Sequence, residues 1–150
     1  MSDPSDIRAW QRLDGRTTTS GKIEAQDVAR LAAIGVKHVI NLALDDHPEA
    51  LADEAVLIAE YGLSYTHIPV PFDAPNETHF EAFRSALEAS GSASVHVHCI
   101  MNYRVSAFFY RLNRDHRGMP EPQARALMEQ QWAPDKASDP RAAVWAEFVK

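Results

Sequence analysis

The 150-residue sequence predicts an α/β fold, a three-layer α/β/α sandwich around a small, mainly parallel sheet of four to five strands. Several segments carry apolar residues at helical spacing, and short runs rich in Val and Ile lie between these segments. The two patterns alternate along the chain and are joined by short connections, as in the crossover units of parallel sheets. Helices are therefore expected to cover the sheet in layers.

The first part of the chain supplies the helix and strand units of this sandwich. Gly35 follows one helical pattern and suits a left-handed cap, whereas Pro48 opens the next helix and Pro69 ends the strand that comes after it. Helices are expected over residues 24–34, 48–62 and 76–90, and strands over residues 17–20, 36–43, 63–70 and 94–99.

The second part of the chain is predicted to be helical. Val105, Phe108, Phe109 and Leu112 repeat at i, i+3, i+4 and i+7, and Gly118 ends that pattern. Two closing helices are expected over residues 120–132 and 138–150, with Trp132 and Trp145 as core anchors. Without an internal repeat or linker, residues 1–150 are interpreted as one domain.

Composition narrows the function classes. Lys and Arg number 15 against 21 Asp and Glu, and the resulting net charge of −6 argues against nucleic acid or an anionic membrane surface as partner. A single cysteine excludes an internal disulfide, and the opening residues lack the pattern of a secretion signal. No apolar run approaches the roughly 18 residues of a membrane span. A cytoplasmic protein is expected.

That single cysteine, Cys99, stands where the strand over residues 94–99 meets a helix that begins near Arg104. Ligands of parallel sheets bind at the carboxyl ends of strands, and the free amides of a helix N-terminus attract anions. A cysteine thiol with a pKa of about 8.5 is mostly protonated at neutral pH and needs neighbours that favour the thiolate. Loop amides and the Ser106 hydroxyl are candidates for this role, since each hydrogen bond to a charged group contributes about 1.5 to 3 kcal/mol.

Arg104 is suited to a different task. Its planar guanidinium can hold two oxygens of a phosphate at once and stays charged at every relevant pH. A cysteine beneath a bound dianion, with an arginine beside it, predicts nucleophilic attack on phosphorus and a phosphocysteine intermediate.

The stretch "VHCIMNYRVSA" resembles the signature loop of cysteine-dependent phosphatases, particularly the bacterial phosphatase-like domains related to dual-specificity phosphatases. The segments "TSGKIEAQDVARLAAIGVKHVINL", "YGLSYTHIPVPFDAP" and "WAPDKASDPRAAVWAEFV" resemble that family in the same order. The resemblance implies Cys99 as nucleophile, Arg104 as phosphate clamp, Ser106 as the hydroxyl that helps the thiolate leave, and His98 as a brace for the loop. It also implies Asp73 as general acid and a phosphorylated protein or small molecule as substrate. The substrate would be bound by Arg104 together with Ile100, Met101, Asn102 and Tyr103.

The loop departs from the family pattern in one respect. Cys99 and Arg104 are separated by four residues, whereas the phosphatase pattern has five, and Asn102 replaces a glycine. A loop of this shorter length resembles that of rhodanese-type sulfurtransferases, in which a cysteine carries a persulfide. Phosphate hydrolysis, sulfur transfer and a catalytically inactive phosphate-binding module thus remain three alternatives.

Other polar residues receive weaker interpretations. Asp45 and Asp46 follow a strand and are alternatives to Asp73 as general acid. His96, His98 and Cys99 lie too close together on one strand for tetrahedral zinc, so neither a metal nor another cofactor is expected. Tyr103 is expected to pack against the sheet.

Overall fold

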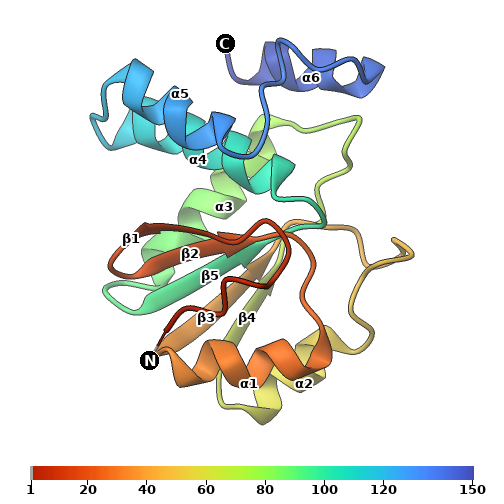
Figure 1. Cartoon of the computed structure of the whole chain (residues 1–150), viewed down its shortest axis with the longest axis vertical. Coiled ribbons are helices and arrows are strands. Elements are labelled where there is room, and N and C mark those ends of the chain that lie inside the picture. Colours follow the sequence, from red (N-terminus) through yellow and green to blue (C-terminus); the bar gives the residue numbers. More distant parts are fainter. Residues whose placement is uncertain (1) are drawn as a thin grey trace.

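The computed structural model describes residues 2–150 and contains a five-stranded sheet with helices on both faces. The strands are β1 (Gln11–Asp14), β2 (Thr17–Ser20), β3 (Val36–Asn41), β4 (Ser64–His67) and β5 (Ser94–His98). The helices are α1 (Ala25–Ala33), α2 (Glu54–Glu60), α3 (Glu77–Ala89), α4 (Tyr103–His116), α5 (Glu121–Glu129) and α6 (Pro140–Phe148). Helices α1 and α2 lie on one side of the sheet and α3 to α6 on the other (Figure 1), which confirms the predicted α/β/α sandwich.

The sheet has the strand order β1-β2-β5-β3-β4. The central strand β5 runs parallel to both β2 and β3, and β3 runs parallel to β4. The edge strand β1, which the sequence did not predict, pairs antiparallel with β2. Because the other four strands are parallel, their carboxyl ends meet at one edge of the sheet, where the loops after β3, β4 and β5 come together.

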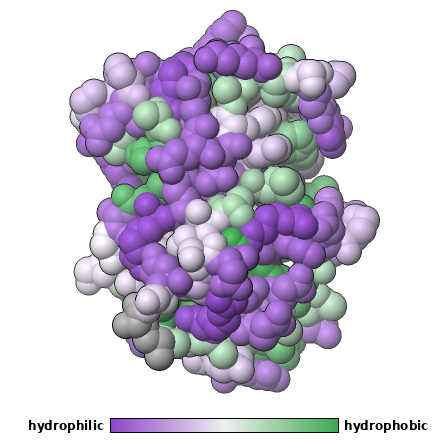
Figure 2. Space-filling model, viewed as in Figure 1, coloured by the Kyte–Doolittle hydropathy of each residue, from purple (hydrophilic) through white to green (hydrophobic). Residues whose placement is uncertain are grey.

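Two apolar clusters hold the layers together, one on each face of the sheet. The smaller cluster joins Val28 and Leu31 of α1 and Ile58 of α2 to strand β3. The larger cluster lies under α3 to α6 and includes Phe83 and Trp145, neither of which is exposed to solvent. The surface in Figure 2 is mainly hydrophilic with small hydrophobic patches. None of the helices in residues 2–150 is long and apolar enough to cross a membrane.

Helix α2 is shorter than the sequence predicted. A helix over residues 48–62 was expected, but α2 begins at Glu54, directly after Asp53 with a left-handed φ of 55°. The residues before it form turns, in which the Ala50 amide donates to the His47 carbonyl oxygen at 2.9 Å. The left-handed residue interrupts the helical backbone. Residues 42–53 therefore form a long loop between β3 and α2, at the carboxyl edge of the sheet.

His96 lies in the interior on strand β5. Its Nδ1 and Nε2 are each 2.8 Å from a hydroxyl oxygen, those of Thr18 and Ser20, and its ring stacks on Trp10. Burial, with a smaller contribution from His98, holds the pKa of His96 well below its ordinary value. The imidazole is therefore neutral in the folded protein.

This neutral histidine predicts a pH-dependent stability. Below about pH 6.5 the imidazole of His96 binds a proton in the unfolded chain but not in the folded protein. The free energy of unfolding is expected to fall as the pH drops below that value, by at most about 1.4 kcal/mol per pH unit. Urea unfolding between pH 7.5 and 5.5 measures the slope, and His96→Gln should flatten it. An equal slope in the two proteins would contradict the prediction.

Candidate active site

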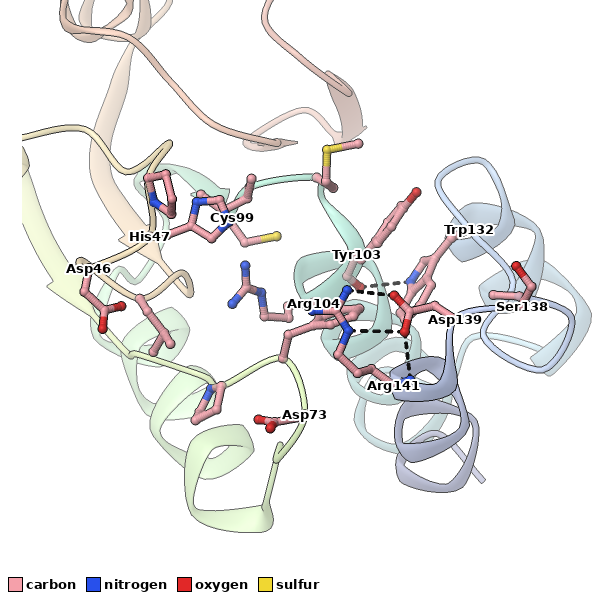
Figure 3. A pocket seen from close by; sticks show the side chains of 17 residues that line it. Asp46, His47, Asp73, Cys99, Tyr103, Arg104, Trp132, Ser138, Asp139 and Arg141 are labelled. Carbon is pink, nitrogen blue, oxygen red and sulfur yellow. Dashed lines mark hydrogen bonds and ion pairs between the residues drawn. The ribbon is translucent and has the colours of Figure 1, made fainter.

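A pocket of about 710 Å³ opens at the carboxyl edge of the sheet (Figure 3). Four segments form its walls, namely the loops after β3, β4 and β5 and the stretch from Trp132 to Arg141 that leads into α6. The lining residues are Leu44, Asp46, His47, Pro48, Pro71, Phe72, Asp73, Cys99, Ile100, Met101, Tyr103, Arg104, Trp132, Ala137, Ser138, Asp139 and Arg141. The pocket thus contains most of the residues that the sequence singled out.

Cys99 lies at the inner end of the pocket, directly after β5, and its side chain has no exposure to bulk solvent. The loop after it is tied to the N-terminal region, because the Lys22 amide donates to the Ile100 carbonyl oxygen at 2.9 Å. Asn102 adopts a left-handed φ of 66° and caps α4, as suits a position where the phosphatase pattern has glycine. The Nδ2 atom of its side chain donates to the Ala9 carbonyl oxygen and to the Thr19 hydroxyl oxygen. The Asn102 side chain therefore points away from the pocket.

Arg104 lies in the first turn of α4 and is buried, with 7% of its surface exposed. Its guanidinium lies beside the Cys99 sulfur in Figure 3. The Nη1 atom donates to the Val70 carbonyl oxygen at 2.9 Å, and the guanidinium carbon lies 5.8 Å from the centre of the Phe72 ring. Arg104 therefore links the loop after β5 to the loop after β4, and its remaining N–H groups can face a bound anion.

Ser106 is not brought to Cys99. Its hydroxyl donates to the Tyr103 carbonyl oxygen at 3.1 Å, and the residue lines a separate small cavity near Gln11. The physical reason is helix geometry, since residues two positions apart do not share a helix face and Arg104 already faces the pocket. The expected hydrogen bond from Ser106 to the sulfur is not present in this structure.

Two of the three candidate general acids line the pocket, each on a different loop. Asp73 lies on the loop after β4, and Asp46 lies on the loop after β3, whereas Asp45 does not line the pocket. The loop that carries Asp73 is held by Trp145 of α6, whose indole N–H donates to the Phe72 carbonyl oxygen at 2.6 Å. Asp73 is thus held beside the pocket by the C-terminal helix.

His98, the last residue of β5, is buried and contacts the first residue of the loop. Its Nε2 lies 2.7 Å from a carboxylate oxygen of Glu54, and its Nδ1 lies 3.3 Å from the Cys99 carbonyl oxygen. Both side chains of the His98–Glu54 pair are about 95% buried, with exposures of 4% and 5%. Burial and the Glu54 carboxylate also raise the pKa of nearby Tyr65. Glu54 is a supporting residue that the sequence did not reveal.

Several residues that line the pocket received no functional role from the sequence, because they lie at or next to the ends of predicted helices. His47 accepts a hydrogen bond from the Glu49 amide at Nδ1, so its neutral form carries the proton on Nε2. Arg141 and its partner Asp139 line the pocket at the start of α6. Trp132, predicted as a core residue, packs in the core and also lines the pocket. Tyr103 was expected to pack against the sheet, but its ring stacks on Trp132 with ring centres 4.6 Å apart and lines the pocket.

The imidazole nitrogens of the two histidines on β5 already contact hydrogen-bonding groups of the protein. Both nitrogens of His96 face hydroxyls, and His98 faces Glu54. Within residues 2–150, no group of three His, Cys, Asp or Glu side chains is arranged to hold a metal ion.

The layered sheet and the cysteine loop at its carboxyl edge define a phosphatase-like α/β protein. A family model for the phosphatase-like domain of beta-lactamase hydrolase-like proteins matches residues 11–113. The chain belongs to this family of phosphatase-like domains. A search of curated protein sequences finds no match.

Solved structures show the same architecture. A candidate phosphatase of the DUF442 family from Shewanella putrefaciens is 30% identical, with a TM-score of 0.81 over 97% of this chain and 91% of that chain. A variant of Pseudomonas aeruginosa TpbA in complex with phosphotyrosine is 20% identical, with a TM-score of 0.72 over 96% and 85% of the two chains. A variant of human DUSP28 is 20% identical, with a TM-score of 0.61 over 94% and 93%. The fold is that of tyrosine and dual-specificity phosphatases.

Proposed function

We propose that this chain is a cysteine-dependent phosphatase that hydrolyses phosphomonoesters. The observation that carries the proposal is the position of the Arg104 guanidinium beside the Cys99 sulfur at the inner end of the pocket (Figure 3). The Cys99 thiolate attacks phosphorus, the alcohol leaves with its ester oxygen, and water then hydrolyses the phosphocysteine to free the thiolate and inorganic phosphate. Arg104 and the backbone amides of the loop stabilise the charge on the transferring phosphoryl group.

Asp73 is the general acid in this proposal. It lines the same pocket as Cys99, on a loop that Arg104 contacts through Val70. Asp73 donates its proton to the departing ester oxygen, and its carboxylate then accepts a proton from the attacking water. Asp46 also lines the pocket, on the loop after β3. Within residues 2–150, the side-chain hydrogen bond of Arg104 goes to Val70 on the Asp73 loop and not to the loop after β3.

Sulfur transfer is a second candidate, because the four-residue spacing between Cys99 and Arg104 is that of rhodanese-type loops. The two chemistries are separated by two assays on the wild-type protein, one with 4-nitrophenyl phosphate and one with thiosulfate and cyanide. Release of inorganic phosphate supports the proposal, whereas thiocyanate without phosphate release supports sulfur transfer. Binding of phosphate without turnover of either substrate supports an inactive phosphate-binding module. Substrates with an aryl group are the natural first choice, since the related TpbA variant holds phosphotyrosine.

Two tryptophans give a matched pair of variants. Trp145 donates its indole N–H to the Phe72 carbonyl oxygen, next to Asp73. Trp132 donates its indole N–H to the Tyr103 carbonyl oxygen at 3.0 Å, next to the loop after β5. Trp145→Phe is expected to loosen the Asp73 loop and slow hydrolysis of phenyl phosphate about tenfold, with a smaller effect on 4-nitrophenyl phosphate. The difference arises because the better leaving group depends less on a general acid.

Trp132→Phe is the control for this prediction, because it removes the same kind of hydrogen bond on the other side of the pocket. It is expected to weaken inhibition by inorganic phosphate and to slow both esters equally. Steady-state kinetics with the two esters measure both effects. A leaving-group dependence that is the same in the two variants would show that Trp145 does not position Asp73.

A further inference from the structure

The pocket is much larger than a phosphoryl group requires. Its volume of about 710 Å³ lies within the range of roughly 300–1,000 Å³ that holds whole drug-sized ligands. The phosphate of a substrate occupies only the inner end, at Cys99 and Arg104. The rest of the pocket is therefore available to the group that carries the phosphate.

An aromatic wall lines the space between the inner end and the rim. Phe72 and Tyr103 both line the pocket, with ring centres 6.4 Å apart. The Tyr103 ring is backed by Trp132, which stacks on it with an interplanar angle of 11°. These rings are fixed by their packing and offer apolar surface to a ring of the substrate.

A second arginine stands beyond this wall. The guanidinium carbon of Arg141 lies 4.8 Å from the centre of the Phe72 ring, and that of Arg104 lies 5.8 Å from the same point. The two guanidinium carbons therefore cannot be farther apart than these distances combined, about 10.6 Å. A small substrate with a ring between two anionic groups can span this separation.

Arg141 is held in place and still has a free donor group. Its Nε and Nη2 atoms donate to the two carboxylate oxygens of Asp139 at 3.2 Å and 2.7 Å. Within residues 2–150, no protein group accepts a hydrogen bond from Nη1. Because Asp139 and Phe72 already restrict the guanidinium, a ligand that binds Nη1 loses little side-chain entropy.

We infer that Arg141 forms a second anion subsite, and that the preferred substrates are aryl phosphates with a further acidic group on the far side of the ring. Arg104 binds the phosphate, Phe72 and Tyr103 contact the ring, and Arg141 binds the distal carboxylate or phosphate. This inference rests on the proposed phosphatase activity. It assigns to the start of α6 a role in substrate selection.

The test compares two esters with the same leaving group, N-acetyl-O-phosphotyrosine, which has a free carboxylate, and its carboxamide. For the wild type, kcat/KM is expected to be about tenfold higher for the carboxylate, mainly through KM. Arg141→Gln should bring this ratio close to one, and Arg141→Lys, which keeps the charge, should restore part of it. Arg84→Gln is the matched control, because Arg84 forms an exposed ion pair with Glu81 on α3 and does not line this pocket.

The possible outcomes separate the two hypotheses. The subsite is overturned, and the phosphatase activity stands, if the wild-type ratio of kcat/KM values is near one. The same conclusion follows if Arg141→Gln leaves the ratio unchanged, or if Arg84→Gln also abolishes it. If neither ester is hydrolysed, the proposed function fails and the subsite fails with it.

The side chains of Arg141 and Asp139 are 58% and 41% exposed, so their ion pair stabilises the fold little. The wild type and the Arg141 variants should therefore have thermal midpoints of unfolding within about 2 °C of each other.

Discussion

Cys99→Ser is expected to lower phosphate release from aryl phosphates by at least about 10⁴-fold, in line with the loss of a nucleophile in other covalent mechanisms. Serine has nearly the same shape, but its hydroxyl is a far weaker nucleophile than a thiolate. Cys99 is fully buried and directly follows strand β5. The next residue, Ile100, is fixed by the hydrogen bond from the Lys22 amide to its carbonyl oxygen. The substitution should therefore change the reaction without changing the loop.

Binding of inorganic phosphate is the control for this prediction. In the proposed mechanism the anion contacts backbone amides and Arg104, and the substitution alters neither. Cys99→Ser should therefore still bind phosphate within a few-fold of the wild-type affinity. Calorimetric titration of the purified variant measures this binding. Full loss of both binding and turnover would mean that the loop has collapsed, and wild-type turnover in the variant would remove Cys99 from the mechanism.

The fold could be predicted because its information is local. The helix and strand patterns alternate, and a mainly parallel α/β sandwich is the architecture that such alternation favours. The unpredicted strand β1 is an edge strand of four residues, Gln11–Asp14, with a single apolar side chain and no alternation to reveal it. The late start of α2 depends on a left-handed Asp53, which no helical periodicity encodes.

The candidate site could be predicted only where its residues are neighbours in the chain. Cys99 and Arg104 share a loop and the start of a helix, so their meeting follows from local geometry. Glu54 lies 44 residues before its partner His98, and Trp145 contacts Phe72 across 73 residues. These contacts depend on how the layers pack, which periodicity does not specify. Ser106 illustrates the converse, because its closeness in sequence does not bring its hydroxyl to the sulfur.

Gly21→Ala is expected to distort the loop after β5, residues 99–104, although Gly21 takes no part in the proposed chemistry. A methyl group at this position would lie 2.4 Å from the Ile100 carbonyl oxygen, a backbone atom that cannot rotate away. The neighbouring Lys22 amide donates to that same oxygen, so relief of the clash must move the loop or break this hydrogen bond. Overpacking of this kind costs about 1–3 kcal/mol of stability.

The displaced loop should also lose much of its function. Because the Ile100 peptide lies next to Cys99, a shift of about 1 Å misplaces the amides that surround the anion, and such misplacement costs about 100-fold in rate. Gly15→Ala is the matched control, since a methyl group there meets no atom within 4 Å and Gly15 has no left-handed φ. Urea unfolding, phosphate binding and kcat/KM are measured for both variants. If Gly21→Ala binds phosphate as tightly as Gly15→Ala, the close approach of Gly21 to the loop does not maintain the shape of the proposed anion site. The loop must then be held by Arg104 and the His98–Glu54 pair instead.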